Sequence, residues 1–333
     1  MSMGAGLDGL VLRQHEVPQP GPNEVLLRVH AVSLNYRELM ILQQGRYPLP
    51  VKPDVVGMCD GAGEVVALGA GVTRAQGGDR VIASIFPRWV DGPFGTECAA
   101  QLGGSLDGML TEYAVLHEDA LVAIPSHLSY EEAATLPCAG VTAWNALTGA
   151  LPLKAGDDVL TLGSGGVSLF ALQFAKAFGA RVIATTSSDA KAARLRELGA
   201  DDVVNYRSTP DWSAEVRRLS GGAGVQHVVE VGGGATLPHS LKAVARSGEI
   251  GFVGTVAGGS SMIDANALFA SGATLRAVAA GSRTQLGGVA RTMAVNRLRP
   301  VIARVFGFDE APAALACYAE GRSFGKIVIR VAA

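Results

Sequence analysis

A glycine-rich turn between an apolar strand and an apolar helix limits the possible folds of this chain more than any other segment. The turn is Gly163-Ser-Gly165-Gly166-Val-Ser168; residues 158–162 before it have the character of a buried strand, and residues 169–178 after it that of a helix. A second apolar strand, 181–186, follows. Glycines in this strand–turn–helix–strand context are typical of a doubly wound parallel sheet. The sequence therefore predicts an α/β fold with a Rossmann sheet.

The turn has the features of a pyrophosphate site. Gly163 permits the tight turn, and Gly165 lets the backbone come close to a ligand. The amides near Gly166 and Val167 open the helix, where N–H donors and the positive end of the helix dipole attract phosphate. Ser168 replaces the third glycine of the usual pattern, so a glycine-rich turn without a ligand is the alternative interpretation. Because of the surrounding strands, we expect the turn to bind a dinucleotide.

The end of the second strand indicates which dinucleotide to expect. An NAD site has a carboxylate there, which binds the ribose 2′-hydroxyl. This strand ends instead with the hydroxyl residues Thr186 and Ser187, Lys191 follows, and Tyr206 ends the next strand beside Arg207. These groups suit a 2′-phosphate, so we expect NADP(H). The alternative is that Lys191 and Arg207 are surface charges without a ligand.

Composition and charge exclude several classes of protein. The chain has 333 residues, of which 48% are hydrophobic and 17% charged, and this suits two domains with buried parallel strands. A net charge of −2 argues against nucleic acid or a membrane surface as a partner. The four cysteines have no CxxC spacing, the start has no signal-peptide pattern, and no apolar run would span a bilayer. We expect a cytoplasmic protein.

The order of strands and helices predicts two domains. Short strands with glycine turns between them suggest a small barrel-like domain in the first third of the chain, at 24–32, 60–67 and 79–83. After Pro125, strands and helices alternate up to a strand at 274–280. A final helix and strand, 311–320 and 325–331, should return to the first domain. The expected domains are 1–123 with 285–333, and 124–284.

These residues resemble the medium-chain dehydrogenase/reductase superfamily over nearly the whole chain, and especially its zinc-free quinone oxidoreductase-like branch. The matching segments are Ser33–Glu38, Gly57–Val65, Leu102–Leu110, Leu136–Trp144, Gly163–Ser168 and Phe324–Val328. The resemblance implies that the β-rich domain is a GroES-like barrel. It also implies a homodimer in which the strand 273–281, expected at the edge of the sheet, pairs with its copy.

The zinc enzymes of the superfamily bind a catalytic metal through Cys, His and Cys or Asp. The resemblance places Asn35, Cys59 and Cys138 at these positions, so an amide replaces the first thiolate and no histidine is present. A catalytic zinc site needs three charged or imidazole ligands and an open position. The zinc enzymes also have a structural lobe with four cysteines, whereas this chain has only Cys98 between Pro87 and Ser105. We therefore expect no metal; the alternatives are small buried thiols or adventitious metal bound together with Asp60.

The absence of zinc narrows the expected chemistry. Alcohol oxidation needs a stabilised alkoxide, whereas a conjugated carbonyl spreads its negative charge and needs only hydrogen-bond donors. We therefore expect an NADPH-dependent oxidoreductase that transfers hydride to a small quinone or α,β-unsaturated carbonyl. The candidate catalytic residues are Asn35, Tyr36 and Tyr47, with Arg37 as a further donor. The alternatives are an alcohol or aldehyde dehydrogenase, assisted by metal at the two cysteines, and a non-catalytic NADPH-binding protein.

The resemblance implies further contacts with the cofactor. Thr142 is similar to the threonine beside the nicotinamide. At the ends of successive strands, where such sheets bind ligands, the implied contacts are Val231, Gly232, Val253 and Gly254. After the last strand and near the C-terminus, they are Gly281, Ser282, Arg283 and Lys326. For the two cations, the alternative is an ordinary surface charge.

Overall fold

The computed structural model describes residues 1, 4–45, 47–258 and 263–331, and its contacts divide the chain into two compact units. Unit 1 comprises Met1–Val141 and Gly281–Ala333, and unit 2 comprises Thr142–Ala280. The C-terminal segment therefore belongs with the N-terminal one. The boundaries differ from the expected 124 and 285, because the segment 124–141 packs on the strands of unit 1.

Unit 1 is built around a long, twisted antiparallel strand. The strands are β1 (Glu24–Ser33), β2 (Asp60–Leu68), β3 (Arg80–Ala83), β4 (Tyr113–His117), β5 (Leu121–Ala123), β12 (Ile302–Gly307) and β13 (Lys326–Arg330). They form one sheet in the order β12-β13-β1-β2-β3-β5, and β4 pairs with β1. β1 pairs with β2 and β4 in its first half, and with β2 and β13 in its second half. Ser33 at its end therefore lies between Asp60 and Val328.

The helices of unit 1 are short except for two. They are α1 (Tyr36–Leu39), α2 (Tyr130–Ala133), α9 (Arg283–Val295) and α10 (Ala311–Ala319), with π turns η2 (Met40–Gln44) and η5 (Leu136–Gly140) and 3₁₀ turns η1 (Leu7–Gly9), η3 (Thr96–Cys98), η4 (Glu118–Ala120) and η6 (Phe308–Glu310). Ser129 caps α2, since its Oγ accepts from the Glu132 amide at 3.2 Å. α2 contacts β1 and β2, and η5 contacts β2 and β3. These contacts explain why 124–141 belongs to unit 1.

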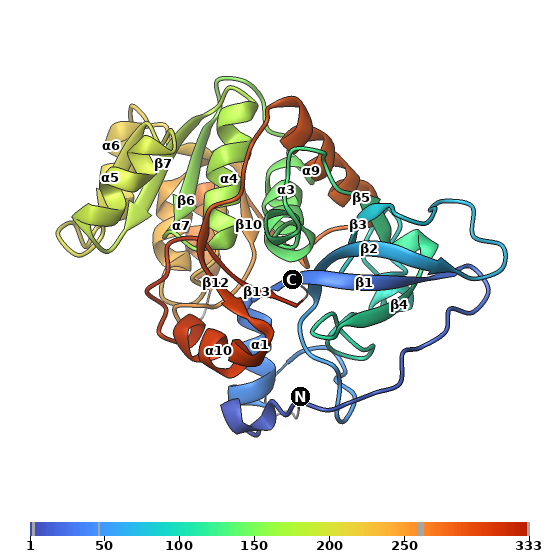
Figure 1. Cartoon of the computed structure of the whole chain (residues 1–333). Coiled ribbons are helices and arrows are strands. Elements are labelled where there is room, and N and C mark those ends of the chain that lie inside the picture. Colours follow the sequence, from blue (N-terminus) through green and yellow to red (C-terminus); the bar gives the residue numbers. More distant parts are fainter. Residues whose placement is uncertain (2–3, 46, 259–262, 332–333) are drawn as a thin grey trace. The chain divides into compact units, whose positions relative to one another are not determined.

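Unit 2 contains the predicted Rossmann sheet (Figure 1). Its strands are β6 (Asp158–Leu162), β7 (Arg181–Thr186), β8 (Asp202–Asn205), β9 (Val225–Glu230), β10 (Val244–Phe252) and β11 (Thr274–Ala277), and its helices are α4 (Gly166–Ala177), α5 (Asp189–Glu197), α6 (Trp212–Leu219), α7 (Leu237–Ala243) and α8 (Ala265–Ser271). A further helix, α3 (Val141–Thr148), begins at the division between the units. The strand order is β11-β10-β9-β6-β7-β8, with parallel pairing throughout.

Consecutive residues of the central strands are buried, as Val182, Ile183 and Ala184 of β7 show. Because successive side chains of a strand point to opposite faces, both faces of this sheet are covered. β11 lies at one edge, as predicted. None of the helices in the described parts of the chain has the length and apolar character that crossing a bilayer requires.

Candidate functional site

The turn after β6 has a backbone that leaves room for a ligand. Gly163 has a φ of +75°, which favours glycine, and its N–H donates to the Thr185 carbonyl at 3.0 Å. Gly165 caps α4 and Gly166 is its first residue. A Cβ atom on Gly163 or Gly165 would meet no described atom within 4 Å. Together with the amides of the first helical turn, including that of Val167, this space fits a pyrophosphate.

Ser168 shows how the turn functions without its third glycine. The side chain is buried, and its hydroxyl donates to the carbonyl of Leu162, the last residue of β6, at 2.7 Å. The third glycine normally allows close packing of helix against strand. Here a small side chain fits the same place and ties the start of α4 to the end of β6.

Glu230, the last residue of β9, shapes the neighbouring loop and was missed by the sequence analysis. Its fully buried carboxylate accepts hydrogen bonds from the Gly232 and Gly233 amides at 2.8 and 2.9 Å and from the Thr236 hydroxyl at 2.6 Å. The Ser240 hydroxyl also donates to it. A buried carboxylate is tolerated because these donors satisfy it, and in return it fixes the loop. The available signal was an acidic residue at the end of an apolar strand.

The loops after β9 and β10 hold four of the predicted cofactor contacts, which are Val231, Gly232, Val253 and Gly254. The Val253 amide donates to the Glu230 carbonyl at 2.8 Å, and the Val256 amide donates to the Val231 carbonyl at 3.1 Å. The two loops therefore lie side by side at the carboxyl ends of parallel strands, where such sheets bind ligands. Thr142 is buried near the start of α3.

The predicted 2′-phosphate residues gather around the start of α5. Thr186 ends β7, and its carbonyl accepts from the Tyr206 amide at 2.9 Å, next to the end of β8. Ser188 caps α5 by accepting from the Lys191 amide at 3.2 Å. Partial burial lowers the pKa of the Lys191 ammonium. Ser187 lies between the strand and the cap, so hydroxyl groups and one lysine lie at this helix start. The carboxylate of Asp189, the first residue of α5, is there as well and accepts from Asn205 Nδ2 at 2.8 Å.

Gly281, Ser282 and Arg283 lie in unit 1, and two of their side chains are engaged there. Ser282 caps α9 by accepting from the Gln285 amide at 3.2 Å. Arg283 donates to the carboxylate of Asp119 at 2.9 Å. Their contact with a cofactor stays a prediction.

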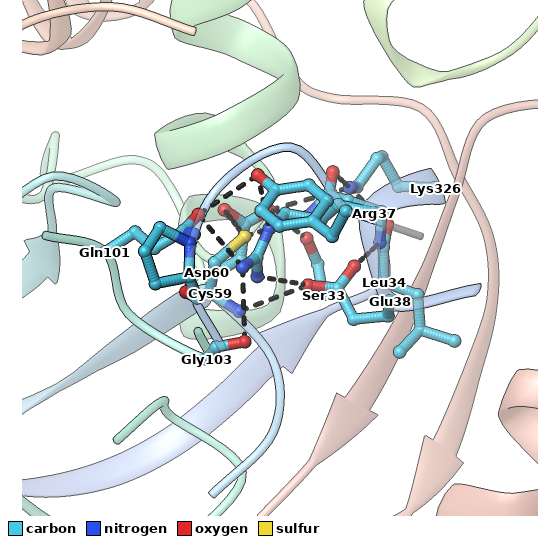
Figure 2. A network of polar contacts seen from close by, with 12 residues as sticks. Ser33, Leu34, Arg37, Glu38, Cys59, Asp60, Gln101, Gly103 and Lys326 are labelled. Atoms are coloured by element: carbon cyan, nitrogen blue, oxygen red, sulfur yellow. Dashed lines mark hydrogen bonds and ion pairs between the residues drawn. The ribbon is translucent and has the colours of Figure 1, made fainter. Parts of the chain in front are cut away.

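A buried polar group of residues forms in unit 1 where β1, α1, β2 and β13 meet (Figure 2). We call it the Asn35 cluster; its members are Ser33, Asn35, Glu38, Cys59, Asp60 and Lys326. β1 ends at Ser33, and Asn35 then caps α1, with its backbone N–H donating to Glu38 Oε2 at 2.8 Å. Asp60 opens β2, and Lys326 opens β13. The pairing of both strands with β1 brings these distant residues together.

Asn35 and Asp60 are joined at the centre of the cluster. Asp60 is fully buried and accepts from Ser33 Oγ at 2.6 Å and from Asn35 Nδ2 at 2.8 Å. The second N–H direction of the Asn35 amide faces Cys59 Sγ at 3.6 Å. The Nδ2 group of Asn35 therefore donates one strong hydrogen bond and makes one long contact to sulfur, which is a weak acceptor.

Lys326, the first residue of β13, is a buried member of this cluster. Its side chain is only 4% exposed, and Nζ donates to the Leu34 carbonyl and to Asn35 Oδ1, both at 2.6 Å. Nζ also lies 3.6 Å from Asp60 Oδ2. The structure makes Lys326 a partner of Asn35, and its expected contact with the cofactor stays a prediction.

Arg37 and Tyr47 form a second group beside the cluster, and Figure 2 labels Arg37 with its partners Glu38, Gln101 and Gly103. The buried Arg37 guanidinium donates to Glu38 at 3.0 Å, to Gln101 and the Gly103 carbonyl at 3.1 Å each, and to Tyr47 Oη at 3.3 Å. Tyr47 in turn donates to Gln101 at 3.0 Å. Burial raises the pKa of the Tyr47 phenol. Gln101, which the sequence analysis missed, therefore accepts the hydrogen bond of the Tyr47 hydroxyl.

Two further tyrosines belong to the same unit. Tyr36 is the half-buried first residue of α1, beside Asn35. Tyr318 of α10 was not predicted; burial first, and then the charge of Glu38, raises the pKa of its phenol. The Tyr318 phenol therefore remains neutral at physiological pH.

Cys59, Asp60 and Cys138 could in principle hold a metal, since one ligand atom from each lies within 4.8 Å of the others. Burial, and then a hydrogen bond with Cys138, raises the pKa of the Cys59 thiol well above its usual range. Asp60 already accepts two hydrogen bonds, and the Lys326 ammonium lies beside it. Asn35 turns an N–H, which cannot ligate metal, toward the Cys59 sulfur. These side chains do not fit a catalytic zinc ion.

Two family models match the chain. The alcohol dehydrogenase GroES-like domain covers residues 21–126, and the zinc-binding dehydrogenase model covers residues 166–294. A putative alcohol dehydrogenase from Sinorhizobium meliloti has a similar solved structure, with a TM-score of 0.91 and 41% identity over 99% of this chain and 97% of that one.

Relatives of similar length carry different activity names. A zinc-type alcohol dehydrogenase-like protein of Schizosaccharomyces pombe is 40% identical over 98% of this chain and 96% of its own length. An acryloyl-coenzyme A reductase of Metallosphaera sedula is 30% identical over 96% of each chain. A quinone oxidoreductase of Pseudomonas aeruginosa is 34% identical over 76% of this chain and 71% of its own. The chain therefore belongs to the medium-chain dehydrogenase/reductase superfamily of nicotinamide-dependent oxidoreductases.

Proposed function

We propose that this protein is an NADPH-dependent reductase that transfers hydride to a quinone or an α,β-unsaturated carbonyl without a catalytic zinc ion. The observation that carries the proposal is the Asn35 cluster. Asn35 stands at the position that resembles the first zinc ligand of related enzymes. Its amide is hydrogen-bonded to the buried Lys326 ammonium and to the Asp60 carboxylate. Such a cluster offers hydrogen bonds rather than a Lewis acid.

The nucleotide is held by unit 2. NADPH, when bound there, supplies the hydride. The Gly163–Gly166 turn and the first amides of α4 would hold its pyrophosphate. Thr186, Ser187 and Lys191, at the start of α5, would hold its 2′-phosphate, because hydroxyl groups and a cation favour that group over a bare ribose hydroxyl.

Asn35 is the proposed donor to the substrate oxygen. A conjugated carbonyl develops negative charge on that oxygen, and a fixed N–H directed at it lowers the barrier. One Asn35 N–H is used by Asp60, and the other makes only the 3.6 Å contact to the Cys59 sulfur. This second N–H is only weakly engaged, because sulfur accepts hydrogen bonds weakly, so we assign it to a carbonyl oxygen placed beside the Cys59 sulfur.

Tyr47 has a supporting part in this proposal. Its single hydroxyl hydrogen is directed to Gln101, and its oxygen accepts from Arg37. It would therefore have to break a 3.0 Å hydrogen bond before donating to a substrate. We assign Tyr47 to holding Arg37 and Gln101 in place, and Asn35 to the oxyanion.

An alcohol dehydrogenase is the second candidate, favoured by the names of several relatives. It would need a group that stabilises an alkoxide and accepts its proton. Near Asn35, burial holds the Cys59 thiol in its protonated form, and Asp60 is committed to hydrogen bonds. The conjugated-carbonyl reaction needs neither, and the acryloyl-coenzyme A reductase among the relatives is named for a substrate of that kind.

The proposal is tested by NADPH oxidation against a panel of quinones, enones, aldehydes and alcohols. We expect turnover with quinones or enones, and little reaction of alcohols with NADP. Turnover confined to aldehydes and alcohols would support the second candidate. NADPH binding without oxidation by any electrophile would instead indicate a non-catalytic binding protein.

The Gly165→Val variant tests the nucleotide site separately from the chemistry. The φ of Gly165 is −79°, which any residue can adopt. A Cβ atom added there would meet no described atom within 4 Å. The variant should therefore fold normally while its side chain fills the space that the pyrophosphate needs. We expect NADPH affinity to fall by about tenfold or more, or about 1.4 kcal/mol.

A further inference from the structure

We propose that Lys326 keeps the Asn35 cluster free of metal by supplying, from within the chain, the positive charge that a metal ion would supply. This inference deepens the proposed function, since it names the residue that makes the site independent of zinc. It rests on the positions of three buried groups: the Lys326 ammonium, the Asn35 amide and the Asp60 carboxylate.

The first argument concerns charge. Asp60 is fully buried, and an isolated carboxylate in such a place is strongly unfavourable. The Lys326 ammonium lies 3.6 Å from Asp60 Oδ2 and is itself 4% exposed, so each charge compensates the other. A divalent ion bound to Asp60 would lie beside this ammonium in a poorly screened environment and would be repelled. The carboxylate therefore already has its cation.

The second argument concerns the orientation of the Asn35 amide. Lys326 can only donate hydrogen bonds, so at 2.6 Å it must face the Asn35 oxygen. Asp60 as a carboxylate accepts, and it faces the Asn35 nitrogen at 2.8 Å. The two partners together permit one orientation of the amide. In it, one N–H of Asn35 is directed to Asp60 and the other faces the thiol of Cys59. The amide oxygen, the one atom of Asn35 that could ligate a metal, is taken by Lys326.

The third argument concerns what would remain without the ammonium. One ligand atom each from Cys59, Asp60 and Cys138 already lies within 4.8 Å of the others, as a cation site requires. Removal of the Lys326 charge would release the carboxylate, and the Asn35 oxygen would become available as a further ligand. Metal binding deprotonates thiols, so the protonated state of Cys59 alone would not prevent it. Lys326 is therefore the positioning residue that decides whether this group accepts a cation.

The test is a titration of reduced protein with Co²⁺ under anaerobic conditions, followed by the absorption that thiolate ligation gives to cobalt. Wild-type protein should show no such band, and Lys326→Met should bind about one equivalent at least about tenfold more tightly than wild type. Lys326→Arg, which keeps the charge, should behave as wild type. Lys154→Met, a change at an exposed lysine, is the matched control.

A stoichiometric cobalt–thiolate band in wild-type protein would overturn the inference. So would a folded Lys326→Met protein that binds Co²⁺ no more tightly than wild type. The Cys59→Ser change added to Lys326→Met should abolish the band, and a band that persists would show that the metal lies elsewhere.

If Lys326→Met does not fold, Lys326→Gln serves in its place, because its amide can still donate to the Leu34 carbonyl or to Asn35 while carrying no charge. In either case, a cobalt–thiolate band in wild-type protein would overturn the inference. The readout does not depend on turnover, so failure to reduce quinones or enones would refute the proposed function alone. Metal binding by the wild-type cluster would refute this inference, and the activity of chelator-treated protein would then decide separately whether the proposed zinc-free reaction stands.

Discussion

The Asn35 amide donates a 2.8 Å hydrogen bond to the Asp60 carboxylate, and both side chains are buried. The bond fixes one N–H of the amide and leaves the other facing the Cys59 sulfur at 3.6 Å. A rigid donor with one weakly used N–H suits an oxygen on which charge develops, because it needs no reorganisation during the reaction.

Replacement of Asn35 by alanine should therefore lower kcat for a quinone or enone by about tenfold or more, which corresponds to about 1.4 kcal/mol of transition-state stabilisation. NADPH affinity, measured by calorimetry, should hardly change because Asn35 is not in unit 2. Tyr47→Phe, which removes a hydroxyl directed to Gln101, is the comparison and should lower kcat less. A larger effect at Tyr47 than at Asn35 would reverse the roles assigned to them.

The preference for NADPH over NADH depends on the start of α5. We expect NADPH to bind at least about ten times more tightly, or about 1.4 kcal/mol. Lys191→Ala should reduce this preference because it removes the cation that we assign to the 2′-phosphate, whereas Lys154→Ala should leave it unchanged. Calorimetric titrations with both dinucleotides measure the ratio, and equal affinity in wild-type protein would refute the assignment.

The free edge of the Rossmann sheet predicts a homodimer. β11 pairs with β10 on one side, and an exposed edge usually needs cover. The Val278 amide donates to Phe252 of β10, so the preceding Ala277 amide points away from β10. Ala277→Pro removes that outward donor, and proline is tolerated on an edge strand. Light scattering should show a dimer for wild type and a monomer for this variant; a monomeric wild type at micromolar concentration would count against the pairing.

His227 in β9 predicts a loss of stability in acid. It is 1% exposed, and burial lowers its pKa despite Asp157 3.5 Å away. As pH falls below 6.5, the ordinary value, the unfolded chain takes up a proton that the folded chain does not. The free energy of unfolding should therefore fall by up to about 1.4 kcal/mol per pH unit until the folded pKa is reached, with no effect above 6.5.

The His227→Gln variant should show a shallower decline in thermal midpoint over that acidic range than wild type. His15→Gln, at an exposed position, is the matched control and should follow the wild-type curve. Identical pH profiles for His227→Gln and wild type would show that another group causes the acid sensitivity.

Sequence patterns predicted unit 2 best. Its strands are continuous apolar runs, and its glycine turn can be recognised from the glycines themselves and the apolar segments on either side. α9 was missed because Gly287 and Gly288 interrupt it; its stability comes from packing, with Leu286, Val289 and Met293 buried. Such packing involves residues far apart in the sequence, so local propensity does not reveal it.

Asn35 was singled out through the family resemblance, and its place directly after a strand agrees with that choice, while its role in the reaction stays a prediction. The place of Lys326 was not predictable from the sequence, because it depends on the pairing of β13 with β1 across almost the whole chain. Gln101 and Glu230 were missed for a related reason: their partners become visible only when loops and strand ends are placed in three dimensions.

Metal-independent turnover is the most direct test of this account. Freshly purified protein would be analysed for bound metal, treated with a chelator, and assayed for NADPH oxidation with the best quinone or enone of the panel. We predict less than stoichiometric metal and full activity after chelation, because the cluster offers hydrogen bonds and an internal cation. If chelation abolishes the activity and zinc restores it, the reaction depends on a metal ion and the account is wrong.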